Sequence, residues 1–237
     1  MVAQIIVGYA DAIIASFRNG GLASIEPEVR VWYNPSLRSA NYVIPGLLGV
    51  IMMVFPPLLT ALAIVREKET RSIEQIFASP LTSAEFLAGK LIPYGAIAFV
   101  EFLMIMAIGF LWFEVPFRGS LLLLTGAALI YVFTTVGLGL FVSTITRTQV
   151  AAMLLAVVLT LMPSTLFSGF IFPVFTMPYA LQLYASSFPA LYFIDLSRNV
   201  TLRGAGLGDV WVNVALIIIY STAIFAAAVW RFRKKVA

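Results

Sequence analysis

The stretch REKETRSIEQIFASPLTSAEFLAGKLIPY, residues 66–94, decides the fold because it places a dense group of charges between two apolar stretches, each long enough to cross a bilayer. Its charged residues are four bases and four acids, namely Arg66, Lys68, Arg71, Lys90, Glu67, Glu69, Glu74 and Glu85. Charges at this density are very costly in hydrocarbon. The chain is therefore expected to leave the membrane here and to re-enter it directly afterwards.

The charged stretch has a helical apolar pattern of its own. Three apolar residues recur in it at helical spacing, namely Ile73, Ile76 and Phe77. This spacing predicts a short amphipathic helix over about residues 67–78, with its apolar edge against something outside the lipid. Pro80 ends that helix. Thr82 then starts a T-x-x-E pattern with Glu85, in which the hydroxyl caps a new helix and the glutamate returns to the cap's own N–H.

The composition sets the class of protein. Hydrophobic residues make up 61% of the chain and charged residues only 11%, which predicts an all-α polytopic membrane protein. The net charge is +4, but the basic residues lie at the ends of apolar runs, where they orient a membrane protein rather than bind nucleic acid. The sequence contains no Cys and no His, so we expect no disulfide, no metal site and no His-based catalysis in it.

Five apolar segments have about the length of a spanning helix, namely residues 42–65, 91–113, 120–143, 149–167 and 210–230. Between the fourth and the fifth lies an apolar stretch, residues 168–209, that is broken by Pro173, Pro178 and Pro189. Its pieces are too short to span a bilayer. Because free backbone is not tolerated in lipid, we expect them to form re-entrant or interfacial helices packed against the bundle.

Residues 1–41 do not fit a spanning helix, because Gln4 and Asp11 interrupt their best apolar run. The pattern predicts strands at residues 4–7 and 29–33 and a helix at residues 11–17. We therefore interpret residues 1–41 as the α+β remnant of a soluble external domain, and residues 42–237 as the transmembrane domain. An external domain needs an earlier span to export it, so the chain is expected to be the C-terminal part of a longer protein or the product of a late start codon.

The basic residues predict the orientation. One side of the membrane collects nine of them: Arg66, Lys68, Arg71, Lys90, Arg147, Arg231, Arg233, Lys234 and Lys235. The other side receives six: Arg18, Arg30, Arg38, Arg118, Arg198 and Arg203. By the positive-inside rule the charged stretch and the C-terminus are expected in the cytoplasm, and the N-terminal segment outside.

A family resemblance rests on these residues. The run R-E-x-E-x-x-S-I-E-Q-I-F-A-S-P-L-T-x-x-E-F-L-x-G-K-L-I-P-Y at residues 66–94 resembles the signature of ATP-binding-cassette (ABC) export permeases of the drug and polysaccharide export class. Further similar runs are V-W-Y-N-P-x-L-R-S-x-N-Y-x-I-P-G, S-G-F-I-F-P and P-x-L-Y-F-I-D-x-x-R at residues 31–46, 168–173 and 189–198. The chain departs from the pattern at Arg71-Ser72, where the family usually has Gly-Thr.

The resemblance implies a bacterial inner-membrane permease with six spans and a large external domain after the first, of which this chain would hold spans two to six. It implies a coupling helix at about residues 66–80 that docks on a separate ABC ATPase, which would bind the ATP and Mg²⁺. The residues expected to couple are Arg66, Glu67, Glu69, Ile73, Glu74, Ile76, Phe77 and Pro80. The other implied partners are a second permease copy or paralogue, a periplasmic adaptor and a hydrophobic or lipid-like substrate.

Two further features have alternative interpretations. The resemblance implies an external gate at Phe170, Phe172, Pro173 and Phe175, whereas the aromatic residues of this region also fit a belt at the headgroup level. Glu101 lies inside the second apolar segment, where a carboxylate pairs with another helix, contacts substrate or couples protons. Hydroxyls and glycines in residues 131–165 either line a path or serve hydrogen bonds to the helix backbone and close helix packing.

The sequence has no P-loop, so ATP hydrolysis is expected from another chain or another part of a longer one, and the chain itself is not expected to be an enzyme. An ion-driven secondary transporter is the first alternative, although Glu101 offers it no second intramembrane charge. An intramembrane enzyme lacks a catalytic set. A membrane anchor or assembly protein is the remaining alternative.

Overall fold

The computed structural model describes residues 13–15, 34, 38–72 and 82–232. Its elements are α2 (Ser39–Glu69), α4 (Ser83–Leu111), α5 (Leu121–Ile145), α6 (Gln149–Leu166), η1 (Val174–Thr176), α7 (Tyr179–Ala185), α8 (Pro189–Arg198), η2 (Asn199–Arg203) and α9 (Leu207–Arg231). Five of them, α2, α4, α5, α6 and α9, are long and apolar enough to cross a membrane. The predicted all-α polytopic fold and its five spans are therefore confirmed. Residues 13–15 are helical, as predicted, whereas the two predicted strands lie outside the described residues.

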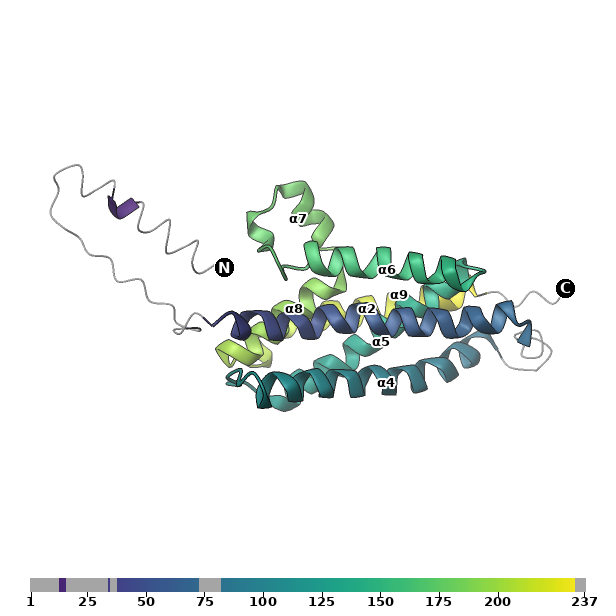
Figure 1. Cartoon of the computed structure of the whole chain (residues 1–237), viewed down its shortest axis with the longest axis horizontal. Helices are drawn as coiled ribbons and strands as arrows, with labels where there is room; N and C mark the ends of the chain where they lie inside the picture. Colours follow the sequence, from purple (N-terminus) through teal and green to yellow (C-terminus); the bar gives the residue numbers. More distant parts are fainter. Residues whose placement is uncertain (1–12, 16–33, 35–37, 73–81, 233–237) are drawn as a thin grey trace.

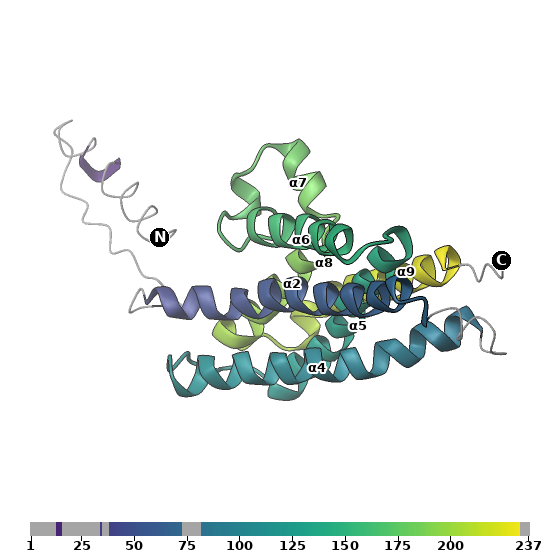
Figure 2. The same cartoon turned by 45° about the vertical axis from the view of Figure 1, so that its right-hand side comes forward.

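The long helices run side by side, and α2 packs against α4, α5, α6 and α8, while α5 also packs along α9 (Figures 1 and 2). The largest buried cluster of the described residues joins α2, α4, α5, α8 and α9 around Tyr131 and Phe193, whose rings stack at 4.2 Å between centroids. The Tyr131 hydroxyl donates a hydrogen bond to the backbone oxygen of Gly49, 3.0 Å away. A buried tyrosine needs such a partner, so α5, α8 and α2 are fixed together at this point.

Helix α2 continues through three internal prolines, Pro45, Pro56 and Pro57. A proline lacks the N–H that would bind the preceding turn. Hydroxyl groups contribute hydrogen bonds close to these residues: Thr60 donates to the Pro56 oxygen at 2.7 Å, and Ser197 of α8 lies 2.6 Å from the Pro45 oxygen. Burial of α2 between its neighbours thus outweighs the helix-breaking tendency of proline.

Glycines allow the helices to approach closely. A Cβ atom on Gly139 of α5 would collide with the carbonyl oxygen of Pro57 and would lie 2.8 Å from the Pro57 Cα, while Gly137 faces Ile224 and Phe225 of α9. The hydroxyls of Thr134, Thr135 and Ser143, like those in α6, donate to backbone oxygens of their own helix. These contacts confirm the interpretation of both groups as packing features.

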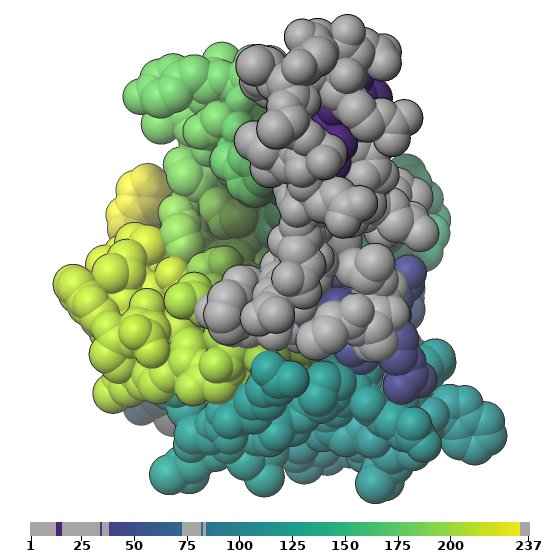
Figure 3. All heavy atoms as spheres, turned by 90° about the vertical axis from the view of Figure 1, so that its left-hand side faces the viewer, coloured from purple at the N-terminus to yellow at the C-terminus, as the bar shows by residue number. Residues whose placement is uncertain are grey.

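The region after α6 forms short helices, as predicted, and they fall into two parts. Helix α8 is buried in the bundle, where Phe193 and Leu196 have no exposed surface. Helix α7 projects from the bundle, and Figure 3 shows it in green above the yellow-green atoms of η2 and the start of α9. The helices that follow α7, rather than α7 itself, are therefore the ones packed into the core.

The turn that ends α2 contains Arg71, where the chain departs from the family pattern. Arg71 has a φ of 57°, in the left-handed region that glycine adopts without strain. Its N–H donates to the Lys68 oxygen at 3.2 Å, and the Thr70 N–H donates to the Arg66 oxygen at 3.0 Å. This is the usual way to close a helix with a left-handed residue after its last turn. The turn keeps the shape that a glycine favours, although an arginine occupies the position.

Gly139→Ala is expected to destabilise the bundle by about 1–3 kcal/mol, because the added methyl group overpacks the contact with Pro57. The matched control is Gly126→Ala in the same helix, where an added Cβ meets nothing within 4 Å. That control should raise stability slightly, since alanine favours helix. Thermal unfolding of the two full-length variants in detergent measures the difference, and equal melting temperatures would contradict the close approach.

Arg71→Gly is expected to stabilise the last turn of α2 by roughly 1 kcal/mol, because it removes the cost of a left-handed side-chain-bearing residue. Arg71→Val should do the reverse, since a β-branched residue is strained in this conformation. Hydrogen exchange of the amides of residues 66–71 measures both effects. Slower exchange in Arg71→Val than in Arg71→Gly would show that the turn has another shape.

Candidate functional site

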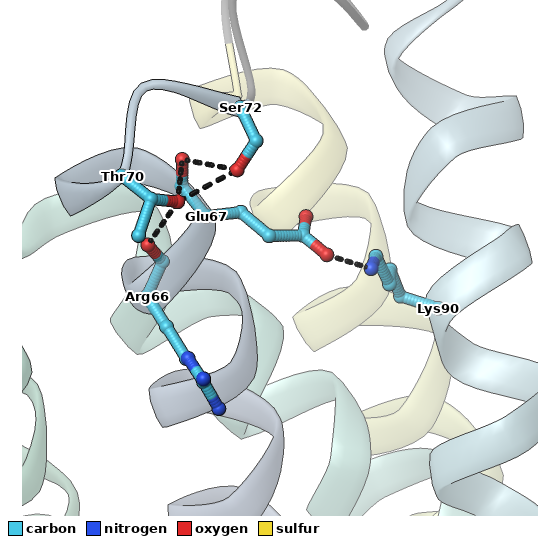
Figure 4. Close-up of polar contacts among 5 residues, drawn as sticks. All are labelled: Arg66, Glu67, Thr70, Ser72 and Lys90. Carbon is cyan, nitrogen blue, oxygen red and sulfur yellow. Dashed lines mark hydrogen bonds and ion pairs between the residues drawn. The ribbon is translucent and has the colours of Figure 1, made fainter.

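Residues 70–82, the charged connection, link α2 to α4. The end of α2 that precedes this connection is joined to α4 by an ion pair. Figure 4 shows Glu67 of α2 reaching across to Lys90 of α4, with the Lys90 Nζ bonded to the Glu67 Oε1. The two side chains are only 27% and 23% exposed, so water screens the pair less than it would at an open surface. The other carboxylate oxygen of Glu67 is buried without a hydrogen-bond partner among the described residues.

The next residue of α2, Lys68, binds the carboxyl end of α5. Its Nζ donates to the backbone oxygen of Ser143 and, at 3.4 Å, to that of Thr146. The last carbonyls of a helix have no partner within the helix and carry the negative end of its dipole. A lysine at this position therefore satisfies them and stabilises the helix end by about 1 kcal/mol.

Glu69 binds the amino end of α6 in the complementary way. Its carboxylate accepts hydrogen bonds from the Gln149 backbone N–H at 2.7 Å and from the Gln149 side-chain amide. Thr148 caps the same helix by accepting from the Ala151 N–H. Free N–H groups and the positive dipole end favour an acid here. Three consecutive residues of α2 thus hold three different helices.

An apolar cluster lies next to these polar contacts and includes α9. Its buried members are Ile64, Phe86, Leu87, Leu140, Ala228 and Phe232. The rings of Phe86 and Phe232 stack with their centroids 5.3 Å apart. Because the cluster contains residues from α2, α4, α5 and α9, the first turns of α4 are held to the bundle by packing as well as by the ion pair.

The structure corrects one boundary and confirms another. Arg66, Glu67 and Glu69 were expected in the coupling helix, but they form the last turn of α2, because the span continues to meet Lys90, α5 and α6. The remaining predicted coupling residues, Ile73, Glu74, Ile76, Phe77 and Pro80, lie outside the described residues. The capping box is present: the Glu85 N–H donates to Thr82 Oγ1 at 3.2 Å, and the Thr82 N–H donates to Glu85 Oε2 at 2.7 Å.

At the opposite end of the bundle, Arg198 lies three residues after Asp195 in α8 but forms no ion pair with it. Its guanidinium donates to three backbone oxygens, those of Tyr42, Gly169 and Phe170, at 3.3, 2.7 and 3.1 Å. It also lies 3.7 Å from the centroid of the Tyr42 ring. Desolvation by burial lowers the pKa of Arg198 from its ordinary value, with Tyr42 and Asp195 acting against the shift. An arginine remains charged under such a shift, so it links α8, α2 and the loop after α6.

Arg198 borders a cavity of about 450 Å³ that Tyr42, Phe175, Tyr192, Asp195 and Asn213 also line. The Asp195 carboxylate accepts from the Asn213 amide at 2.8 Å.

The residues predicted for an external gate do not form one group. Phe170 packs close to Gly46 of α2, whereas Phe172 and Phe175 are 54% and 77% exposed. Pro173 precedes η1 and is partly buried. Their role in gating stays a prediction.

Glu101 lies on α4 and is partly exposed along one side of the helix, next to the exposed Val100 and Met104. Its carboxylate makes no hydrogen bond or ion pair within the described ranges. The structural partner that was one of its three interpretations is therefore not supplied by this part of the chain. Substrate contact and proton coupling stay predictions.

Sequence reasoning missed the roles of Lys68, Lys90, Ser143 and Gln149 in this end of the bundle. The signal that exists is short-range: Lys68 and Glu69 lie at the end of a predicted helix, and Gln149 at the start of another. The helix end that each charged side chain binds depends on how the helices pack, and the sequence pattern does not predict that packing.

Comparison with known proteins places this arrangement in a family. The family model described as "ABC-2 family transporter protein" matches residues 4–230. The probable multidrug ABC transporter permease YbhS of Escherichia coli K12 is 35% identical over 211 residues, covering 89% of this chain and 56% of that protein. The permease YbhR of the same strain, named likewise, is 32% identical over 240 residues, covering 99% and 65%.

The inner membrane transport permease YhhJ of Escherichia coli K12 is 29% identical over 240 residues, covering 99% of this chain and 63% of that protein. The chain thus spans less than two thirds of the length of these relatives. The family model covers nearly the whole chain, and the five long apolar helices agree with it. The chain is a multi-pass membrane protein that belongs to the ABC-2 transporter family.

Proposed function

We propose that the chain is part of the membrane subunit of an ATP-driven ABC exporter. The substrate would be hydrophobic or amphiphilic and would leave the cytoplasm or the inner leaflet when a partner ATPase binds and hydrolyses ATP. The observation that carries the proposal is the set of contacts made by the last turn of α2, directly before the charged connection, in a chain of the ABC-2 family. There, Glu67, Lys68 and Glu69 fasten α2 to α4, α5 and α6.

These contacts suit a helix end that receives a force from a protein outside the membrane. A segment that only had to satisfy the charge bias of a loop would need no contacts with three helices. Because each contact ends on a helix terminus or on a charged side chain of another helix, a push on the connection reaches several helices at once. The ATPase, a separate chain or a further part of a longer protein, would hold the ATP and Mg²⁺.

In the proposed orientation, the α2–α4 end of the bundle faces the bacterial cytoplasm and the N-terminal segment lies outside. The distribution of described bases supports it: Arg66, Lys68, Arg71, Lys90, Arg147 and Arg231 belong to the α2–α4 end. The opposite end holds Arg38, Arg118, Arg198 and Arg203. A second copy or a paralogue would complete the permease pair, with a periplasmic adaptor as a further partner and the loop at residues 170–175 as the gate.

One observation favours a second candidate, an ion-driven secondary transporter. Glu101 is a carboxylate within a spanning helix whose partner is not among the described residues, and such groups often mark ion pathways. The exporter is the better-supported function because a relay needs a second charge at a similar depth. A membrane anchor without transport is the remaining alternative, and substrate-stimulated ATP hydrolysis would rule against it.

The ATPase partner can be tested by co-purification. The full-length permease, extracted from membranes, is expected to retain its ATPase, and the double variant Phe77→Ala with Glu74→Arg is expected to lose most of it. The reason is that truncating one buried aromatic anchor at an interface costs about 2 kcal/mol or more, roughly thirtyfold in affinity. The amount of ATPase bound per permease is the measurement.

The matched control is Phe175→Ala with Glu114→Arg, which makes the same chemical changes at exposed residues of the opposite end. It should leave ATPase binding unchanged. Loss of the ATPase in both double variants would indicate general damage, and retention in both would remove the coupling role from residues 74 and 77. If the unmodified permease never brings down an ATPase, the secondary-transporter and anchor functions take precedence.

A further inference from the structure

We propose that the Glu67–Lys90 ion pair is a clamp that transmits movement of the charged connection to the spanning helices, so that both side chains are positioning residues for energy coupling. The inference rests on the proposed function. It concerns residues within the described bundle and not the surface that would touch the ATPase. Figure 4 shows the two side chains bridging the facing helices directly next to the turn that begins the connection.

The position of the pair is what gives it this role. Glu67 lies three residues before Thr70, where α2 ends, and Lys90 lies eight residues after the cap Thr82, about 12 Å along α4. The pair therefore closes a ring that contains the connection and the first two turns of α4. With the pair formed, a force on the connection moves α2 and α4 together. With it broken, among the described residues only the apolar packing of Phe86 and Leu87 holds the start of α4 to α2, and the same force moves the two helices together less completely.

The contacts of α2 with α5 and α6 differ from this one in kind. Lys68 binds backbone oxygens and Glu69 binds a backbone N–H and an amide, so neither depends on a charge in the partner helix. Within the described residues, Glu67–Lys90 is the one ion pair that joins two spanning helices. Its strength therefore depends on both charges, and exchanging them should preserve it.

The surroundings of Glu67 also leave the pair able to rearrange. Its second oxygen is buried without a partner in the described part of the chain, and a buried acceptor without a hydrogen bond is costly. Lys90 in turn lines an open groove on α4 with Glu85, Phe86 and Tyr94. The Glu67 carboxylate is thus not held by further hydrogen bonds among the described residues, in contrast to a fully satisfied core pair.

The test uses the full-length permease with its co-purified ATPase in proteoliposomes. Spin labels at Leu122→Cys and Tyr179→Cys, which are exposed in the unmodified protein and lie at the starts of α5 and α7, far from the α2–α4 connection, report the movement of that end of the bundle. Any native cysteines elsewhere in the full-length protein are first replaced. Distances are measured without nucleotide and with ATP and vanadate, and ATP hydrolysis is measured in parallel.

In Glu67→Lys and in Lys90→Glu, the share of complexes that change distance on ATP binding is expected to fall roughly tenfold, while ATP hydrolysis continues. The exchange variant, Glu67→Lys with Lys90→Glu, should restore the distance change. Glu67→Gln should show an intermediate loss, because it keeps a hydrogen bond to Lys90 without the charge. A merely stabilising role would lower the melting temperature without separating hydrolysis from movement.

The inference is overturned if single variants keep the distance change, or if the exchange variant fails to restore it while remaining folded. It is also overturned if hydrolysis and movement decline in the same proportion. Failure of the proposed function has a different signature, since the unmodified permease would then bind no ATPase. Lys90→Met removes the charge and keeps an apolar side chain. If its melting temperature equals that of the unmodified protein, a loss of the distance change in this variant does not come from unfolding.

Discussion

The close packing of α2 against its neighbours is the constraint on which the rest of the bundle depends. In the most hydrophobic stretch of α2, 67% of the residues are buried, against 11% in that of α9, so α2 is the central helix and α9 is peripheral. Two glycine contacts set its distance from its neighbours. Gly139 of α5 meets Pro57, and Gly49 of α2 itself meets Ile194 of α8. Because helices in lipid associate through close packing rather than the hydrophobic effect, these small residues fix the arrangement.

Both ends of α2 are closed by charges that bind the ends of other segments. At one end Arg198 gathers the oxygens of Tyr42, Gly169 and Phe170, and at the other Lys68 and Glu69 bind the ends of α5 and α6. Backbone groups at membrane depth must be satisfied by protein, and these charged side chains do so where helices stop. Among the described residues, the charged side chains other than Glu101 therefore lie near the places where helices begin and end.

The sequence was sufficient for the features that depend on local patterns. Length and hydropathy located the five spans, and the T-x-x-E pattern located the start of α4, because a span and a capping box each depend on residues close together in the chain. It was insufficient for Arg198, because the oppositely charged residue at helical spacing, Asp195, is not its hydrogen-bond partner. Its actual partner Tyr42 lies 156 residues away, and only the packing of α8 on α2 brings the two together.

The contacts at the two ends together make α2 and α6 a connected pair. Glu69 binds Gln149, the first residue of α6, while the loop that follows α6 presents the oxygens of Gly169 and Phe170 to Arg198 beside the start of α2. A sliding of α6 along α2 therefore has to break the hydrogen bonds at one end or at both. Bonds to a charged group are stronger than neutral ones, so the contacts at the two ends oppose such sliding. The pair is therefore suited to move as one unit, because packed helices have discrete arrangements rather than continuous ones.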